Sequence, residues 1–309
     1  MDFKLIAAPM QGYTEAPFRH FHARLSGGAD EYYTPFIRFE QGHARPKDMR
    51  DLTSPLNDNH TVVPQIIFKD LDEFRTLTDE LVSAGFHRID LNMGCPFPPQ
   101  VNRGRGAGLL RRPDIIKQVV QEIHQRPEIS FSVKMRPGID NIRDWENILP
   151  LLNVAKLAAL TVHPRLAANQ YFGELEIRQF ERILLTSANP VIFNGDITTP
   201  DQIDVIRKRY PEIIGIMVGR GLLMRPSIFD EYRNGYEIER ATLLLQLVAF
   251  HQYLFEYYDE TLNGEAHLLQ KMKPFWDYSE AIIGRRNWKA IKKTSSVPGY
   301  LAAVRNIII

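Results

Sequence analysis

The sequence contains a single cysteine, Cys95, among its 309 residues. One cysteine excludes an intrachain disulfide framework and a cysteine-rich zinc module, and we predict no metal site. No apolar run approaches the roughly 20 residues that a membrane span needs. The first residues carry an acid at position 2 and lack a long apolar stretch, so they do not resemble a signal peptide. We therefore expect a soluble, cytoplasmic protein that acts as a monomer.

A strong excess of one charge is also missing, because 38 lysines and arginines stand against 37 aspartates and glutamates. The chain as a whole is therefore not a polycation. Hydrophobic residues make up 44% and charged residues 24% of the sequence, which argues against an intrinsically disordered chain. Its length suits one large α/β barrel with a small additional unit.

The charge is distributed unevenly, with a basic segment at the C-terminal end. Residues 265–309 contain eight lysines and arginines and three acids, a net charge of +5, which leaves a net charge of −4 for the residues before them. A basic region beside a neutral-to-acidic body favours a polyanionic partner held at one end of the molecule. A solvated helix face is the alternative interpretation, and charge alone does not separate the two.

Short apolar segments alternate with helix-like segments over the first two thirds of the chain. We expect helices at residues 70–84, 114–124 and 201–209, and β-strands at residues 4–8, 32–39, 62–67, 88–91, 130–135, 159–162, 191–193 and 215–218. Eight buried strands with intervening helices predict a (β/α)8 TIM barrel, a fold of the α/β class. A doubly wound open sheet is the competing arrangement, but no G-x-G-x-x-G pattern follows the first strand.

Strand-like segments stop after about residue 236. Helices are expected instead at residues 237–262, 267–282 and 288–293. We therefore predict two domains: a catalytic barrel over residues 1–236, and a small all-helical domain over residues 237–309 that carries the excess positive charge.

Polar residues and glycines recur at the predicted carboxyl ends of the strands, where the catalytic groups of TIM barrels lie. Any one of them alone is typical of a loop cap, but their recurrence from strand to strand predicts a site. They are Pro9, Met10, Gln11, Arg38, Gln65, Asn92, Lys134, His163, Asn194, Gly195, Asp196, Gly219, Arg220 and Gly221.

The clusters at residues 194–196 and 219–221 follow the predicted seventh and eighth strands. This is the usual place of a phosphate site in a barrel. Glycines there let backbone N–H groups approach phosphate oxygens, and Arg220 adds positive charge. Each glycine by itself is explained by a tight turn, but together the two clusters favour a phosphorylated cofactor.

Three residues suggest redox and acid chemistry. Lys134 lies within an apolar strand, where a lysine needs a partner; that partner is either Asp90, in a salt bridge, or a reduced cofactor ring whose negative charge the lysine stabilises. His163 follows the next strand and could hydrogen-bond the same ring. Cys95 stands in a Gly-Cys-Pro turn, and because an unperturbed thiol has a pKa of about 8.5 it suits a general acid as well as a nucleophile.

Six segments together resemble the flavin-dependent tRNA-dihydrouridine synthases. They are AAPMQGYTEAPFR (residues 7–19), IDLNMGCP (89–96), VKMRPG (133–138), TVHPR (161–165), FNGDI (193–197) and MVGRGLL (217–223). They occur in that family's order and spacing across nearly the whole barrel, and the basic helical tail is similar to its tRNA-binding domain. LNMGCP is the most specific element, because the flavin barrel signature alone is shared with other enzymes such as dihydroorotate dehydrogenases.

The resemblance implies an oxidoreductase that carries FMN, is reduced by NADPH and passes hydride to C6 of a uracil in tRNA while Cys95 protonates C5. A flipped uracil needs a flat surface to stack on, which the flavin ring supplies. The implied flavin contacts are Pro9, Met10 and Gln11 along the flavin, Gln65 and Lys134 at its ring, His163 at the ring or its phosphate side, and Asn194, Gly195, Asp196, Gly219 and Arg220 at the ribityl phosphate.

The same resemblance implies contacts with tRNA. Asn92 would face the target base, and basic residues of the tail would meet the tRNA backbone, which makes binding dependent on salt. The implied contacts are Arg38, Asn92, Arg165, Lys271, Lys273 and Lys293, of which Arg38 and the three lysines resemble the subfamily that modifies position 16 of the D-loop.

Two other functions stay open at this point. A flavin oxidoreductase of a free pyrimidine or another small enone would have no need of the basic C-terminal helices. A tRNA-binding protein without catalysis would have no need of Cys95, Lys134 and the phosphate cradle together.

Overall fold

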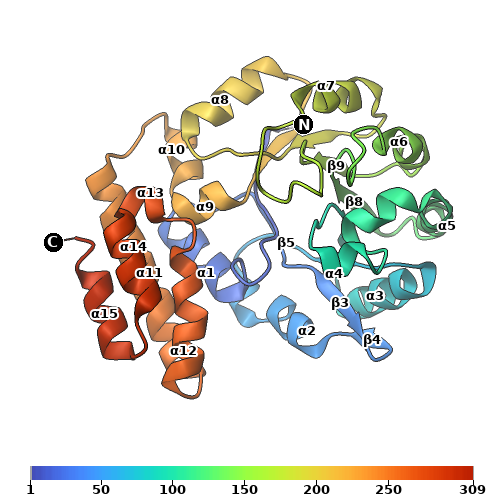
Figure 1. Cartoon of the computed structure of the whole chain (residues 1–309). Coiled ribbons are helices and arrows are strands. Elements are labelled where there is room, and N and C mark those ends of the chain that lie inside the picture. Colours follow the sequence, from blue (N-terminus) through green and yellow to red (C-terminus); the bar gives the residue numbers. More distant parts are fainter. Residues whose placement is uncertain (1, 309) are drawn as a thin grey trace.

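The computed structural model describes residues 2–308, and its eleven strands form one sheet at the centre of the molecule (Figure 1). The strands are β1 (Lys4–Ala7), β2 (Glu31–Tyr33), β3 (Ile37–Glu40), β4 (His43–Ala44), β5 (Val62–Val63), β6 (Gln65–Ile67), β7 (Arg88–Met93), β8 (Ser130–Met135), β9 (Ala159–Val162), β10 (Val191–Phe193) and β11 (Gly215–Val218).

The sheet is a closed parallel barrel. Its strand order is β4-β3-β6-β7-β8-β9-β10-β11-β1-β2-β5, and only the β3–β4 pair is antiparallel. One residue, Pro64, separates β5, at one end of this order, from β6, which pairs with β3 near the other end, so the sheet closes on itself. Closure confirms the predicted TIM barrel and excludes the doubly wound open sheet.

Two predicted strands are each divided into two pieces. The strand expected at 32–39 is interrupted at Thr34–Phe36, and the strand expected at 62–67 is interrupted at Pro64. Pro35 and Pro64 have no N–H group to donate to a neighbouring strand. The side chain of Thr34 bridges the gap, because its hydroxyl oxygen accepts from the Gln65 N–H at 3.1 Å.

Helices cover the outside of the barrel, as Figure 1 shows. The predicted helices at 70–84, 114–124 and 201–209 are confirmed as α3, α5 and α8 within two residues at each end. Side chains cap two of them: Asp70 accepts from the Glu73 N–H at 2.9 Å at the start of α3, and Thr199 with Gln202 forms a capping box at the start of α8. The helices of this part are α1 (Ala16–Leu25), α2 (Pro46–Leu52), α3 (Leu71–Ser83), α4 (Pro98–Val101), α5 (Pro113–His124), α6 (Trp145–Asn153), α7 (Ile177–Thr186), α8 (Pro200–Arg209), α9 (Arg220–Met224) and α10 (Ile228–Asn234).

The rest of the described chain contains helices and no strand. They are α11 (Arg240–Thr261), α12 (Glu265–Met272), α13 (Glu280–Ile283), α14 (Arg285–Lys293) and α15 (Val297–Arg305). The prediction of one helix over 267–282 is wrong: Pro274 removes a backbone donor, and the segment becomes α12, the 3-10 helix Lys273–Trp276 and α13. The predicted boundary at residue 236 falls between α10 and α11.

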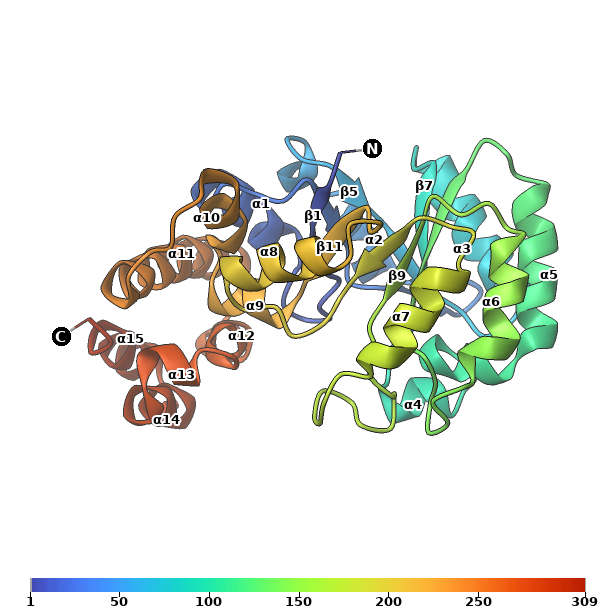
Figure 2. The same ribbon diagram turned by 90° about the horizontal axis from the view of Figure 1, so that it is seen from above.

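The helical part packs against the barrel through α11 and α1, as Figure 2 shows. The rings of Phe18 and Phe250 are 5.1 Å apart, and both side chains are buried. Polar contacts extend this interface: the Tyr13 hydroxyl donates to Asp277 at 2.7 Å, and the same carboxylate pairs with Lys292. Figure 2 also places α12–α14 on the same side of the molecule as α4, the helix that follows the carboxyl end of β7.

Within residues 2–308, no helix combines the length and the apolar character that crossing a membrane requires.

Candidate active site

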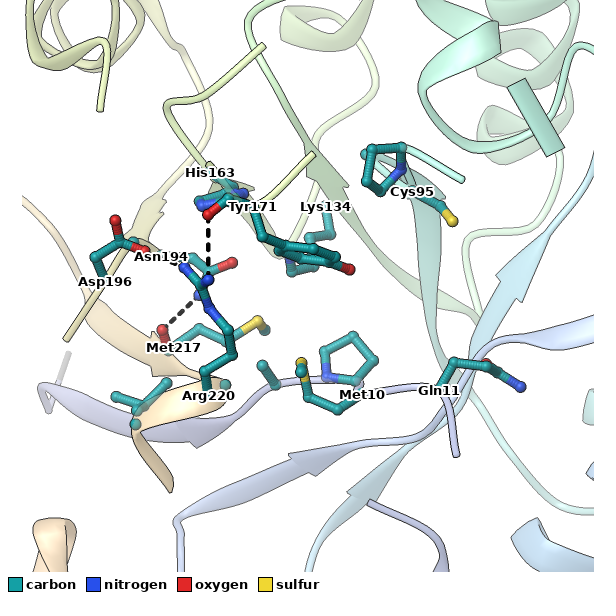
Figure 3. A pocket seen from close by; sticks show the side chains of 18 of the residues that line it. Met10, Gln11, Cys95, Lys134, His163, Tyr171, Asn194, Asp196, Met217 and Arg220 are labelled. Carbon is teal, nitrogen blue, oxygen red and sulfur yellow. Dashed lines mark hydrogen bonds and ion pairs between the residues drawn. The ribbon is translucent and has the colours of Figure 1, made fainter. Parts of the chain in front are cut away.

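A cavity of about 640 Å³ opens at the carboxyl ends of the barrel strands (Figure 3). Its volume lies within the range of small-molecule and cofactor sites. Residues from the ends of β1, β7, β8, β9, β10 and β11 meet there, as the barrel fold requires. Thirteen predicted site residues line it: Pro9, Met10, Gln11, Asn92, Cys95, Lys134, His163, Asn194, Gly195, Asp196, Gly219, Arg220 and Gly221.

Three predicted residues of the barrel lie outside this lining. Gln65 is fully buried behind the cavity. Arg38 donates to both carboxylate oxygens of Asp48, at 3.0 and 2.9 Å. Arg165 is only 1% exposed and forms an ion pair with Asp196, which does line the cavity.

The three predicted lysines of the helical part also lie outside it. Lys271 forms an ion pair with Glu15 of the barrel, and its ammonium lies 5.1 Å from the centroid of the Tyr258 ring. Lys273 donates to the backbone carbonyl of Thr294. Lys293 is exposed at the end of α14. Of the three, Lys293 is the side chain most open to an external partner.

Lys134 places a positive charge at the base of the cavity. The register pairs it with Asn92 on β7 and Thr161 on β9, and among residues 2–308 its ammonium has no ion-pair or hydrogen-bond partner. The alternative interpretation of a salt bridge with Asp90 is therefore not supported. Burial, followed by repulsion from Arg136, lowers the pKa of Lys134 to about 8. Such a group is suited to an anionic ligand or cofactor.

Cys95 is held at the cavity wall by a hydrogen-bonded turn. The Asn92 side-chain oxygen accepts from the backbone N–H groups of Gly94 and Cys95, at 3.1 and 2.8 Å. The chain passes so close behind the cysteine that a Cβ on Gly106, whose φ is +57°, would lie 2.8 Å from the Cys95 Cβ. Burial raises the pKa of the Cys95 thiol, so the sulfur keeps its proton at neutral pH.

At the opposite side of the cavity, the ends of β10 and β11 form a cradle of unpaired donors. The backbone N–H groups of Gly195, Asp196 and Gly219 have no acceptor within the described part of the chain. Close packing requires the glycine that follows Arg220, because a Cβ on Gly221 would lie 1.9 Å from the carbonyl oxygen of Ile197. Arg220 forms an ion pair with Asp196 and donates to the carbonyl of Tyr171 at 3.2 Å (Figure 3).

His163 lies between Lys134 and this cradle (Figure 3). Burial lowers its pKa well below the ordinary value, and the nearby charges of Arg136 and Lys134 act in the same direction. The imidazole is therefore neutral at physiological pH. Arg165 Nη1 lies 3.4 Å from His163 Nε2, a geometry that favours the lone pair on that nitrogen.

The residues that line the cavity without having been predicted as site residues include three tyrosines and an arginine: Tyr13, Arg136, Tyr171 and Tyr278. Tyr13 and Arg136 lie inside the segments that resemble the family, each two residues from a predicted site residue, and this proximity is the available signal. Tyr171 comes from a long loop after β9, and Tyr278 comes from the helical part. No pattern in the sequence indicates that either reaches the barrel mouth.

Among residues 2–308, no three histidine, cysteine, aspartate or glutamate side chains gather in a way that could hold a metal ion.

A closed parallel barrel whose strand ends surround a cavity of this kind is the architecture of a TIM-barrel enzyme. A family model described as Dihydrouridine synthase (Dus) matches residues 5–305. The chain therefore belongs to the dihydrouridine synthase family, and it is an oxidoreductase.

Similar proteins agree with this membership. The chain is 32% identical to tRNA-dihydrouridine synthase B of Yersinia pestis over 236 residues, which cover 74% of this chain and 71% of that one. It is 28% identical to a probable tRNA-dihydrouridine synthase of Staphylococcus aureus (strain Mu50 / ATCC 700699) over 263 residues, which cover 82% and 78% of the two chains.

Solved structures share the fold. Morphinone reductase superposes with a TM-score of 0.52 at 11% identity, covering 76% of this chain and 87% of that one. TcOYE, in a crystal structure with pHBA, superposes with a TM-score of 0.53 at 9% identity, covering 76% and 90%. At these identities the likeness concerns the barrel alone.

Proposed function

We propose that this protein is a tRNA-dihydrouridine synthase that uses FMN and NADPH to reduce the C5–C6 double bond of a D-loop uridine, at position 16. The observation that carries the proposal is one cavity with an anion cradle at one side, a free ammonium at its base and a protonated thiol at its wall. Family membership and the tRNA-dihydrouridine synthases among the relatives supply the reaction.

The residues present fit FMN. Unpaired N–H groups at Gly195, Asp196 and Gly219, together with Arg220, would hold the phosphate. Pro9, Met10 and Gln11 would lie along the flavin, and Lys134 would meet the ring. His163 and Asn194 would lie between the two ends. Gln65 would act on this site from behind, through Asn92, because it does not reach the cavity.

When bound, FMN would supply the hydride that NADPH provides and that ends on C6 of the uracil. The chain contributes the proton: the Cys95 Sγ–H would give it to C5, and the resulting thiolate would be reprotonated from solvent. Lys134 would favour negative charge on the ring side of the cavity. Tyr171 and Tyr278, both at the cavity, would flank an inserted base.

The exposed face of α14 would meet the tRNA backbone. Arg285, Lys289 and Lys293 are spaced by four residues and so lie on one side of the helix, next to Arg286. All four are exposed, and within residues 2–308 only Arg285 among them has an acidic neighbour, Glu280, at 3.9 Å. By contrast, Lys271 and Lys273 are held by groups of this chain and would help to place the helical part against the barrel.

The test incubates the protein with FMN, NADPH and unmodified tRNA and maps dihydrouridine by mass spectrometry. Product at position 16 supports the whole proposal, and product at another D-loop position overturns the choice of position 16 only. If the bound flavin is reduced by NADPH and no tRNA product forms, while a small enone is turned over, the protein is a small-molecule oxidoreductase instead.

A further inference from the structure

A chain of buried hydrogen bonds connects the barrel interior to the Cys95 turn. The strand register places Gln65 of β6, Asp90 of β7 and Ser132 of β8 in one row across the sheet. Asp90 is fully buried and accepts from Gln65 Nε2 and from the Ser132 hydroxyl, both at 2.6 Å.

The chain continues from this row toward the cavity. Gln65 Oε1 accepts from Asn92 Nδ2 at 2.7 Å, and Asn92 Oδ1 accepts from the N–H groups of the Cys95 turn. Neither Gln65 nor Asp90 touches the cavity. Direct contact with a ligand in the cavity therefore cannot explain the presence of Gln65 and Asp90.

The direction of this chain is determined at its inner end. A side-chain amide can turn over and exchange its oxygen for its NH₂ group, so Gln65 and Asn92 could each point either way. An ionised carboxylate only accepts hydrogen bonds. Asp90 therefore requires the NH₂ group of Gln65, which leaves the Gln65 oxygen for Asn92 and the Asn92 oxygen for the turn. If the amides were reversed, an NH₂ group would face the two backbone N–H groups.

We propose that Asp90 is a positioning residue, whose carboxylate fixes the direction of a hydrogen-bond relay that ends at the Cys95 turn. The proposal rests on the function proposed above for the role of Cys95 in catalysis, but the relay itself is a property of the folded chain. Burial raises the pKa of Asp90 to about 6, while hydrogen bonds from Ser132 and Gln65 oppose that rise, so the carboxylate is ionised at neutral pH.

The relay can be broken and then restored in reverse. Asn92→Asp keeps the size of the side chain and an acceptor for the turn, but it places a second carboxylate against Gln65. Two carboxylates at the two ends of one amide cannot both be satisfied, because the amide offers its NH₂ group at one end only. Adding Asp90→Asn removes the conflict: the new amide donates to Gln65 Oε1, Gln65 donates to the carboxylate at position 92, and the turn keeps its acceptor.

The experiment compares four proteins at pH 7.5: the unaltered chain, Asp90→Asn, Asn92→Asp and the double variant. Hydrogen exchange of the Gly94 and Cys95 amides is read by mass spectrometry, and dihydrouridine formation is read in single turnovers. We expect exchange at least tenfold faster, and product formation at least tenfold slower, in Asn92→Asp. The double variant should return the exchange rates to within about threefold of the unaltered chain and form product faster than Asn92→Asp.

The single and double variants carry the same residue at position 92, so intrinsic exchange rates and local charge at the turn are matched. A double variant no better than Asn92→Asp overturns the proposal, since a role in packing alone predicts no rescue. If Asn92→Asp does not fold, Gln65→Glu creates the same conflict with Asp90, and Asp90→Asn should rescue it in the same way. If the unaltered chain forms no dihydrouridine, the proposed function is contradicted. The exchange rates of the Gly94 and Cys95 amides would still test whether the relay exists.

Discussion

At the scale of single residues, the position of Lys134 at the cavity lowers the stability of the folded protein at neutral pH. Its side chain is half-buried at the cavity, its ammonium has no hydrogen-bond or ion-pair partner among residues 2–308, and its pKa is lowered to about 8. Between pH 8 and the ordinary lysine pKa of about 10.4, the unfolded chain therefore binds more protons at this residue than the folded chain does. The contribution of Lys134 to stability consequently rises with pH over this window and is unfavourable at pH 7.

Lys134→Met should therefore stabilise the cofactor-free protein at pH 7 by about 1–3 kcal/mol and weaken the binding of FMN. Thermal unfolding with and without FMN measures both effects. Lys117→Met on the exposed face of α5 is the matched control, for which a change within about 0.5 kcal/mol is expected. A variant that is less stable than the parent without FMN would contradict this account.

Cys95 is the second residue whose surroundings predict a result. Cys95→Ala should keep flavin binding and NADPH-driven flavin reduction, and it should slow dihydrouridine formation by about 10²–10⁴-fold, the usual contribution of a general acid. Because burial raises the pKa of the thiol, activity should decrease only as the pH rises through that value. Cys95→Ser preserves the volume but offers a weaker acid, so it should stay inactive. Unchanged turnover in either variant would remove the acid role.

The sequence made the cavity residues predictable where short segments placed them at strand ends. Thirteen predicted residues line one cavity because the barrel brings all strand ends to one face. Pairings between side chains were not predictable. The sequence leaves open whether Asp90 forms a salt bridge with Lys134. In the structure Asp90 instead accepts hydrogen bonds from Gln65 and Ser132, because the strand register places these three residues in one row.

At the scale of elements, the nine-residue helix α14 carries four exposed basic side chains: Arg285, Arg286, Lys289 and Lys293. Replacing Arg286 and Lys289 with glutamate should weaken tRNA binding and reduce the slope of log K against log salt by roughly 0.7–0.9 for each phosphate that the helix no longer neutralises. Binding measured at several salt concentrations tests this. Lys117→Glu on α5, on the barrel side away from the helical part in Figure 2, is the matched control. An unaltered slope would make α14 a solvated face only.

The ends of helices were predictable from the sequence where a capping residue or a proline marks them. The acids before α3 and the proline at the start of α8 placed these helices correctly. The divided strands at Pro35 and Pro64, and the broken helix at Pro274, were missed although each proline is visible in the sequence. Apolar periodicity continues across a proline, whereas the backbone hydrogen bond does not.

At the scale of the whole molecule, the barrel and the helical part share a buried interface. Phe250 of α11 is 2% exposed and packs on Phe18 of α1. Phe250→Ala should destabilise the protein by about 3–5 kcal/mol, and it should lower the melting temperature of the barrel and the helical part together. Leu245 lies on the same helix with 58% of its surface exposed, so Leu245→Ala should change stability by less than about 0.5 kcal/mol.

Circular dichroism and the fluorescence of bound flavin, recorded during the same thermal scan, measure this coupling. Coincident transitions in the parent and in Phe250→Ala support one cooperative unit. Two separate transitions would show that the barrel and the helical part unfold independently.

The fold class was predictable from the alternation of strands and helices, but the relation of the two parts was not. Tyr13 of the barrel reaches Asp277 across 264 positions in the sequence, and Tyr278 enters the cavity from the helical part. Such contacts depend on how two packed surfaces meet, and neither surface carries a local sequence pattern for the other.

The position of Tyr278 in the sequence affects the order in which the cavity wall forms during synthesis on the ribosome. Synthesis proceeds from the N-terminus, and earlier segments can fold while later ones are still being made. Every strand of the barrel has left the ribosome well before residue 278 does, yet the wall of the cavity is incomplete until that residue takes its place. A nascent barrel therefore lacks this part of the cavity wall until residue 278 has emerged and the helical part has packed against the barrel.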